Sequence, residues 1–248
     1  MTATLVERAP AGLTAEDCAA RLGGRSWFAW LDGGSDHAGL GRWSYLSAEP
    51  WAAYRAFGER TERREAGGGW IPVPGDILTA MGEELRTHAT EPLAGAPAFQ
   101  GGAVGYLAYD WGRVLERRSA ARYADLALPE AVFGLYDLVV AWDHHAGEGW
   151  LVSTGLPCTG AARAARARER LAALRGWLTA RGSGPALGDA LVAHPGERPA
   201  GIEVAPSWPV LALEGAEQVG LRSTFTHRGY LSAVQRVREY ILAGDIFQ

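Results

Sequence analysis

The stretch AVFGLYDLVVAWDHHAGEGWLVSTG, residues Ala131–Gly155, decides the fold class of this chain. Two apolar runs flank the polar segment His144–Gly149, whose glycines suit a tight turn between strands. The pattern predicts a β-hairpin. Strands that follow one another through hairpins favour antiparallel sheets, so the stretch indicates an α+β protein rather than a doubly wound α/β protein.

Four further segments carry the signals of helices. Thr14 is predicted to cap a short helix that ends at Leu22, and Thr226 a longer one that is closed by Gly244. Residues 76–89 and 159–182 also predict helices, because their apolar side chains recur at helical spacing. The expected apolar faces are Ile77, Met81 and Leu85; Leu171, Leu174, Trp177 and Leu178; and Tyr230, Val234, Val237 and Ile241.

Two other segments are predicted to form strands. Residues 25–31, RSWFAWL, are rich in aromatic side chains and predict a buried strand, and residues 42–57 predict one or two strands broken near Pro50. Residues 183–220 are rich in proline and glycine without sustained periodicity, so we expect a linker there. The expected fold class is α+β, with antiparallel sheets packed against flanking helices.

The composition is that of an ordinary globular chain and excludes several classes of function. Of 248 residues, 48% are hydrophobic and 21% charged. The net charge is −4 and the pI about 5.9, so no global basic field attracts nucleic acid. No apolar stretch approaches the ~18 residues of a membrane span, and no leader pattern is visible. We therefore expect a cytoplasmic protein with no nucleic acid and no membrane as partner.

The chain contains no lysine, since all 24 of its basic residues are arginine. A phosphate-binding P-loop requires a lysine, and pyridoxal chemistry requires one that forms a Schiff base, so both are excluded for this chain. The two cysteines, Cys18 and Cys158, lack nearby Cys or His partners in the sequence. They indicate neither a disulfide framework nor a zinc site.

A glycine-rich stretch, FQGGAVGYLAYDWGR, occupies residues Phe99–Arg113. A dinucleotide-binding loop needs G-x-G-x-x-G between a strand and a helix, whereas Gly101, Gly102 and Gly105 form G-G-x-x-G inside an apolar run. Glycines in such a run more often permit the close approach of another backbone. We therefore interpret the stretch as a tightly packed strand.

The remaining polar motifs are weak signals for a site. His144 and His145 are adjacent and would point in opposite directions on a strand, so a solvated hairpin tip is favoured over a metal site. The arginines of residues 159–182 are interpreted as a solvated helix face. The loop 32–41 holds a small cluster of two aspartates and a histidine. No spacing resembles a hydrolase triad or paired carboxylates, so the residues by themselves assign no chemistry.

Several segments together resemble the N-terminal half of the chorismate-utilising synthases, the large subunits of anthranilate synthase and aminodeoxychorismate synthase. These segments occur in the family's order and spacing, and they are Gly41–Pro50, Phe99–Arg113, Leu128–His144 and Phe225–Gln248. The resemblance implies the N-terminal portion of the family's four-layer fold. It implies an anthranilate synthase component I-like N-terminal domain at residues 1–182, the linker at 183–220, and the start of a chorismate-binding catalytic domain at 221–248.

The resemblance also implies a reaction. Aminodeoxychorismate synthase component I adds ammonia to chorismate and forms 4-amino-4-deoxychorismate, the precursor of 4-aminobenzoate and folate. The ammonia comes from a glutamine amidotransferase, as a separate subunit or a fused domain. The family's catalytic residues, including a nucleophilic lysine, and the ligands of its Mg²⁺ cofactor are expected beyond Gln248. We therefore expect this chain to be an N-terminal fragment that is inactive by itself and holds no metal.

Two details favour aminodeoxychorismate synthase within the family. Anthranilate synthases carry Leu-Leu-Glu-Ser where feedback tryptophan binds, whereas residues 30–33 are Trp-Leu-Asp-Gly. Residues 109–113, Tyr-Asp-Trp-Gly-Arg, are similar to the aminodeoxychorismate synthase form. Carried over by position, a tryptophan pocket would comprise Asp32, Gly33, Arg42, Trp43 and Ser44. The alternatives are anthranilate synthase component I, for tryptophan or a secondary metabolite, and a non-catalytic amino-acid-binding module.

Overall fold

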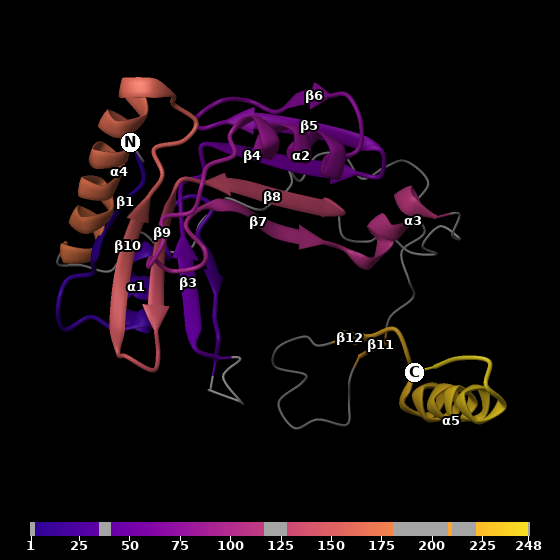
Figure 1. Cartoon of the computed structure of the whole chain (residues 1–248). Coiled ribbons are helices and arrows are strands. Elements are labelled where there is room, and N and C mark those ends of the chain that lie inside the picture. Colours follow the sequence, from indigo (N-terminus) through magenta and orange to yellow (C-terminus); the bar gives the residue numbers. More distant parts are fainter. Residues whose placement is uncertain (1–2, 35–40, 117–127, 181–207, 210–221, 248) are drawn as a thin grey trace. The chain divides into compact units, whose positions relative to one another are not determined.

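A computed structural model describes residues 3–34, 41–116, 128–180, 208–209 and 222–247 (Figure 1). The chain forms two compact units. The first unit comprises residues 1–120 and 128–194, and the second comprises residues 121–127 and 195–248. The domain boundaries expected from the sequence stay a prediction.

The first unit contains two five-stranded antiparallel sheets, which confirms the α+β class. The first sheet has the order β1-β10-β9-β3-β2, and the second has the order β6-β5-β4-β8-β7. The strands of the first sheet are β1 Leu5–Arg8, β2 Ala29–Leu31, β3 Trp43–Ser47, β9 Leu138–Asp143 and β10 Glu148–Ser153. Those of the second are β4 Ala52–Phe57, β5 Arg60–Glu65, β6 Ile71–Val73, β7 Gly102–Leu107 and β8 Ala131–Tyr136. In Figure 1 the first sheet's strands run upright and the second sheet's run across the view.

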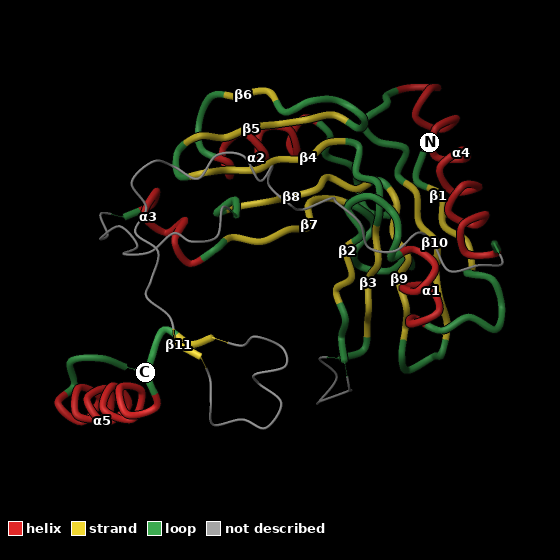
Figure 2. The backbone as a smooth tube through the Cα atoms, turned by 180° about the vertical axis from the view of Figure 1, so that it is seen from behind, coloured by secondary structure: helices red, strands yellow, loops and turns green. Residues whose placement is uncertain are grey.

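Each sheet carries helices. The helices α1, Ala15–Leu22, and α4, Gly160–Thr179, lie side by side against the first sheet (Figure 2). The helix α2, Ile77–Thr87, packs against β4 of the second sheet, and the short helix α3, Gly112–Leu115, follows β7 after one 3₁₀ turn. The helix starts agree with the sequence signals: Thr14 Oγ1 accepts a hydrogen bond from Asp17 N at 3.1 Å, and the Asp17 carboxylate accepts one from Thr14 N at 2.9 Å.

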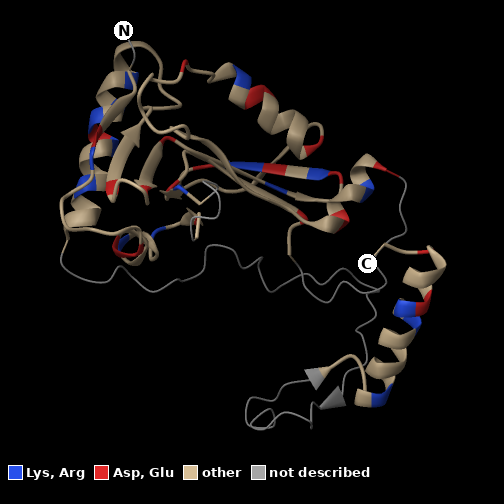
Figure 3. Cartoon of the chain, turned by 60° about the horizontal axis from the view of Figure 1, so that its bottom comes forward, with Lys and Arg blue, Asp and Glu red and all other residues tan. Residues whose placement is uncertain are grey.

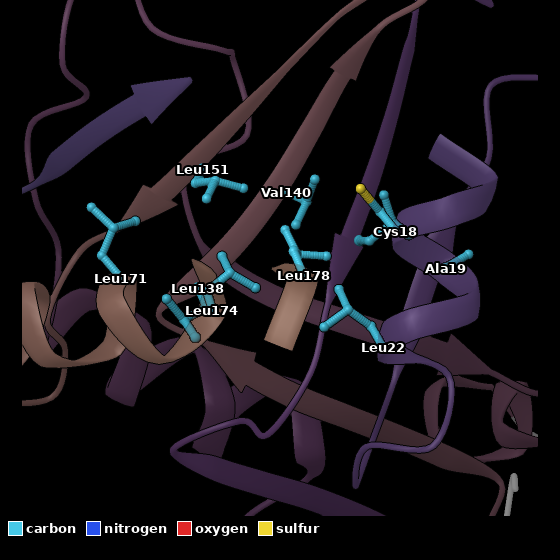
Figure 4. Packing of buried hydrophobic residues seen from close by; sticks show 10 residues of the cluster. Cys18, Ala19, Leu22, Leu138, Val140, Leu151, Leu171, Leu174 and Leu178 are labelled. Carbon is cyan, nitrogen blue, oxygen red and sulfur yellow. The ribbon is translucent and has the colours of Figure 1, made fainter. Parts of the chain in front are cut away.

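The core of the first sheet lies between its strands and these two helices (Figure 4). Leucines of α4 pack against strand residues and α1, which confirms the face predicted for residues 159–182. Each fully buried leucine contributes roughly 1.5–3 kcal/mol to folding. The members of this cluster are Cys18, Ala19, Leu22, Leu46, Leu138, Val140, Leu151, Leu171, Leu174 and Leu178.

The stretch that predicted the fold forms three strands. The hairpin is confirmed, because β9 and β10 pair from Asp143↔Glu148 to Leu138↔Ser153. The first apolar run continues upstream as β8 in the other sheet, so the chain passes from one sheet to the other at Asp137. The side chain of Asp137 is completely buried at this crossing.

The prediction of a buried strand at residues 25–31 is wrong. Only Ala29–Leu31 forms a strand, and β2 lies at the edge of its sheet, where Trp30 and Leu31 are 37% and 47% exposed. Trp27 adopts a left-handed backbone with φ of 56°, which cannot continue a strand. The break predicted near Pro50 is confirmed, since β3 ends before it and β4 begins after it in a different sheet.

The glycine-rich stretch is a packed strand. Its β7 pairs with β8 along six residues, and a Cβ atom at Gly105 would lie 1.9 Å from the carbonyl oxygen of Val132. Gly101 has φ of 142°, and a Cβ atom there would lie 2.9 Å from Tyr136 O. These glycines therefore permit close backbone approach, as the sequence predicted.

The described part of the second unit consists of a two-residue ladder and one helix. The strands β11 Trp208–Pro209 and β12 Arg222–Ser223 pair, and α5 spans His227–Ala243. Thr226 Oγ1 accepts from Gly229 N at 3.1 Å, and Gly244 ends the helix with φ of 81°, which confirms both predicted ends. The linker predicted at 183–220 lies outside the described residues apart from β11.

Candidate functional site

A polar cluster forms where the loop after β2 meets β3 and the β9–β10 turn. Ser44 Oγ donates a hydrogen bond to Asp32 Oδ1 at 2.8 Å, accepts one from Gly33 N at 3.0 Å, and lies 2.7 Å from His144 Nε2. The Ser44 side chain is completely buried, whereas Asp32 is exposed. Three of the five residues that the sequence assigned to a pocket thus touch one another.

The protons in this cluster can be counted. A serine hydroxyl donates one hydrogen bond and accepts up to two, and the single proton of Ser44 goes to the Asp32 carboxylate. His144 Nε2 must therefore carry a hydrogen and donate it to Ser44. The hydrogen bonds from Ser44 and then from Gly34 N hold the pKa of Asp32 below its usual value. The carboxylate consequently stays ionised near neutral pH.

The prediction that both histidines lie at a solvated hairpin tip is wrong for His144. Its side chain is half-buried and joins the cluster through Ser44, and its backbone N donates to Arg42 O at 2.8 Å. No sequence signal indicates this contact, because Ser44 and His144 are 100 residues apart. Within the part of the chain that the structure describes, no group of three or more His, Cys, Asp or Glu residues could hold a metal ion.

Beside the cluster, Arg42 and Asp143 form a bidentate ion pair. Arg42 Nε lies 3.2 and 3.1 Å from the two carboxylate oxygens, and Arg42 Nη2 lies 2.6 Å from Oδ2. Asp143 also accepts from His145 N at 3.0 Å and Ala146 N at 3.2 Å, so it fixes the start of the hairpin turn. The Arg42 hydrogen bonds lower the pKa of Asp143, and the same pair raises the pKa of Arg42.

Aromatic side chains lie next to this ion pair on one face of the first sheet. The Trp43 and Tyr45 rings stack with centroids 6.2 Å apart, and Phe99 meets Tyr45 edge-on at 5.6 Å. The Arg42 guanidinium lies 5.3 Å from the Trp43 ring centroid. All five residues assigned to a pocket therefore lie on neighbouring elements, but Trp43 and Ser44 are adjacent on β3 and point to opposite faces of the sheet. Asp32 and Ser44 are already paired with each other, and Arg42 with Asp143. Their role as a binding pocket stays a prediction.

Gly33 has no room for a side chain. A Cβ atom there would lie 2.6 Å from Trp43 O and 2.8 Å from Gly41 O. Any residue with a side chain at this position would require the loop to move. The hydroxyl that bonds Asp32 comes from Ser44.

The arginine-rich face of α4 is not simply solvated, contrary to the sequence-based interpretation. Arg163 Nε donates to Thr154 O and Arg166 Nε to Leu156 O, both at 2.8 Å. Arg170 Nη2 lies 3.2 Å from Asp137 Oδ1 and 2.9 Å from Glu49 O. These arginines bind the strand ends and the carboxylate that is buried where the chain crosses between the sheets.

The comparisons with known proteins identify the family. The model of the chorismate binding enzyme family matches residues 41–248. The chain therefore belongs to the chorismate binding enzymes, which confirms the resemblance found in the sequence. None of the helices in the described ranges is both long and apolar enough to cross a bilayer.

The relatives carry two different names. Anthranilate synthase component 1 of Cereibacter sphaeroides is 32% identical over 84% of this chain and 38% of its own length. Anthranilate synthase component 1 of Thermus thermophilus is 34% identical over 77% of this chain and 32% of its own length. Aminodeoxychorismate synthase component 1 of Bacillus subtilis is 29% identical over 70% of this chain and 31% of its own length. The chain thus spans roughly a third of the length of these curated relatives.

Part of the chain also matches a solved structure, anthranilate synthase component I from Streptococcus pneumoniae, with a TM-score of 0.41 and 20% identity. The match covers 54% of this chain and 28% of that one.

Proposed function

We propose that this chain is the N-terminal part of an enzyme that aminates chorismate. The observation that carries the proposal is the family match over residues 41–248, together with relatives that are synthases of this kind by name. The substrate would be chorismate. The second component implied by the name "component 1" would be a glutamine amidotransferase that supplies ammonia, as a separate subunit or a fused domain.

The contribution of the present chain would be structural. It has no lysine to serve as a nucleophile, so the residues that perform the chemistry, and with them the ligands of Mg²⁺, would lie in the remainder of the protein. The two sheets and their helices would then provide the packed scaffold against which that remainder is positioned.

Of the two products, we favour 4-amino-4-deoxychorismate. Asp32 and Gly33 replace the Glu-Ser pair of the tryptophan motif, and the loop leaves no space for a side chain at position 33. Arg42, the cation available for a ligand carboxylate, is already paired with Asp143. These features argue against ordinary tryptophan feedback, which belongs to anthranilate synthesis. Anthranilate synthase is the second candidate, because more of the relatives carry that name.

The test is an assay of the full reading frame that contains this chain, with chorismate, ammonia and Mg²⁺. We expect a product that an added aminodeoxychorismate lyase converts to 4-aminobenzoate. Direct appearance of fluorescent anthranilate, without the lyase, would establish the second candidate instead. If the complete protein consumed no chorismate, the alternative of a non-catalytic amino-acid-binding module would remain. The 248-residue chain assayed in parallel is expected to be inactive.

We also propose that Asp32, Gly33, Arg42, Trp43 and Ser44 form a weak amino-acid pocket. The Asp32 carboxylate would accept hydrogen bonds from the ligand ammonium, and the Arg42 guanidinium would face the ligand carboxylate. The ligand carboxylate would have to compete with Asp143 for Arg42. This competition predicts binding that is weaker than at an unpaired arginine.

A thermal-shift titration with L-tryptophan tests this pocket. At a concentration of ~100 times the dissociation constant, a ligand raises the melting temperature of a chain of this size by roughly 5–10 °C. Asp32→Asn should abolish the shift, whereas Glu59→Gln, at the exposed β4–β5 turn, should retain it. An unchanged melting temperature in millimolar tryptophan would rule the pocket out.

A further inference from the structure

A second place in the first unit has the features of a binding site. A cleft of about 240 Å³ opens between the segment before β2, the segment after β3, and the paired strands β4 and β5. Its lining includes Trp27, Glu49, Pro50, Ala53, Arg64 and Ala66. It lies at the Ala29↔Ser47 end of the β2–β3 ladder, whereas the polar cluster of Asp32 and Ser44 lies beyond the opposite end, Leu31↔Tyr45. The two sites are therefore distinct.

Two residues of the lining have left-handed backbones. Trp27 has φ of 56° and Glu49 has φ of 52°, and they are the non-glycine residues with positive φ among those the structure describes. The surrounding structure holds both in place. Tyr136 Oη donates to Trp27 O at 2.7 Å, Glu49 N donates to Ser26 O at 2.8 Å, and Arg170 Nη2 donates to Glu49 O. Bulky residues rarely adopt this conformation, and such outliers concentrate at ligand sites.

Arg64 is a cation with no carboxylate partner among the described residues. Its neighbours on the two strands are paired: Arg55 with Glu62 at 2.6 Å, and Arg63 with Glu84 at 2.6 Å. The Arg64 guanidinium instead lies over two indole rings, 4.8 Å from the centroid of Trp27 and 5.0 Å from that of Trp70. Its side chain is half-buried, and burial, followed by repulsion from Arg55, lowers its pKa.

A second hydrogen-bond donor in the lining also lacks an acceptor. Trp27 is 8% exposed, and its Nε1–H has no hydrogen-bond partner within the described ranges. Buried donors are normally satisfied, and a buried cation is costly unless it is paired. The cleft thus holds two donor groups, the Arg64 guanidinium and Trp27 Nε1–H, that have no acceptor among the described residues.

The missing partner can be characterised chemically. The Trp27 and Trp70 ring centroids are 6.0 Å apart and lie 4.8 and 5.0 Å from the Arg64 guanidinium carbon, so both rings lie on one side of the cation. Its paired N–H groups have no acceptor among the described residues, and they match a carboxylate. The walls from Trp27, Pro50 and Ala53 are apolar and suit a ring. The volume lies below the roughly 300–1,000 Å³ of pockets for drug-sized ligands, so a single ring is the appropriate size. Glu49 and Glu65 also line the cleft and would repel a second negative charge.

We propose that this cleft binds a small aromatic monocarboxylate, with the carboxylate on Arg64 and the ring against Trp27. Chorismate carries two carboxylates, so the cleft would not be a substrate site of the reaction proposed above. The proposal does not depend on that reaction, because binding to this unit can be measured whether or not the complete protein is a synthase.

The test uses benzoate and the 248-residue chain labelled with ¹⁵N at its indole nitrogens. Benzoate should shift the Trp27 Nε1–H resonance, assigned with Trp27→Phe, in a saturable manner. Arg64→Gln should weaken the binding by about tenfold or more, because a charge-assisted hydrogen-bond pair is lost. Arg60→Gln is the matched control, since Arg60 lies on the same strand with a side chain that is 64% exposed. It should leave the affinity unchanged.

Comparisons on the unsubstituted chain keep the proposal testable if Arg64→Gln fails to fold. Benzamide, which lacks the charge, and phthalate, which carries two carboxylates, should both bind at least about tenfold more weakly than benzoate. Inorganic phosphate should not displace benzoate. Equal binding of benzamide or phosphate, or the same affinity for the Arg64 and Arg60 variants, would overturn the proposal, and so would the absence of a saturable benzoate shift.

Discussion

Asp143 keeps its charge although its side chain is only 5% exposed. Two backbone amides and the bidentate Arg42 surround the carboxylate, and these contacts replace the water that it loses on folding. The same residue ends β9 and begins the turn that the sequence predicted. One side chain thus links the hairpin to the residues that were assigned to a ligand pocket.

This arrangement predicts a pH-dependent contribution to stability. Arg42 lowers the folded pKa of Asp143, below the unfolded value of about 3.9. The ionised carboxylate therefore stabilises the fold above that value, and the stabilisation is lost as the pH falls through the folded pKa. Asp143→Asn should lower the free energy of unfolding, measured in urea at pH 7. The difference in this free energy between the variant and the original chain should shrink below about pH 4.

Glu148→Gln is the control for this measurement. Glu148 lies at the other end of the same turn and forms an ion pair with Arg8, but its side chain is 48% exposed. Its loss should change the free energy of unfolding by less than about 1 kcal/mol. A difference between the original chain and Asp143→Asn that persists unchanged at pH 3 would contradict the proposed role of the charge.

At the scale of elements, the glycines of β7 set how closely it approaches β8. Gly105→Ala should lower the free energy of unfolding by roughly 1–3 kcal/mol or more, because the added Cβ would lie 1.9 Å from Val132 O and the strands would have to separate. Gly69→Ala is the matched control, since nothing lies within 4 Å of its Cβ position. Urea unfolding of both variants measures the effect, and equal stabilities would refute the packing role.

The helices were the elements that the sequence predicted best. Their ends depend on local chemistry, such as Thr14, Thr226 and Gly244, and their buried faces on a spacing that is visible within a few residues. The strand β5 was missed because its sequence, RTERRE, contains no apolar alternation. Its charged residues form a run of blue and red along one strand in Figure 3. They are stabilised by partners on other elements, such as Glu84 of α2 for Arg63.

The contacts of the candidate site were less predictable than its position. The sequence placed Asp32 and Ser44 together by resemblance, but the joining of His144 and the pairing of Arg42 with Asp143 depend on strand register between β3 and β9. The same limitation applies to α4. From the sequence its arginines are interpreted as solvated, because the sequence does not show that Arg166 and Arg170 pair with Asp137 where the chain crosses between the sheets. The cleft at Arg64 had no sequence signal, because it depends on backbone conformation at Trp27 and Glu49.

At the scale of the molecule, the two units differ in how they bury apolar side chains. The buried clusters of the described residues all belong to the first unit. The apolar residues of α5 remain exposed, including Tyr230 at 56%, Leu231 at 57% and Leu242 at 85%. An amphipathic helix gains most of its stability from burying its apolar face, and the described residues of the second unit do not bury that of α5.

This difference predicts that the 248-residue chain self-associates through α5. Light scattering after size-exclusion chromatography should detect oligomers or aggregates. Replacing Val234 and Ile241 by glutamate should shift the chain towards monomer, because both lie on the exposed apolar face, at 39% and 42% exposure. Gln235→Glu with Arg238→Gln changes the net charge by the same two units on neighbouring exposed positions of α5, and should leave the association intact. If the unsubstituted chain is monodisperse and monomeric, the apolar face of α5 does not drive association.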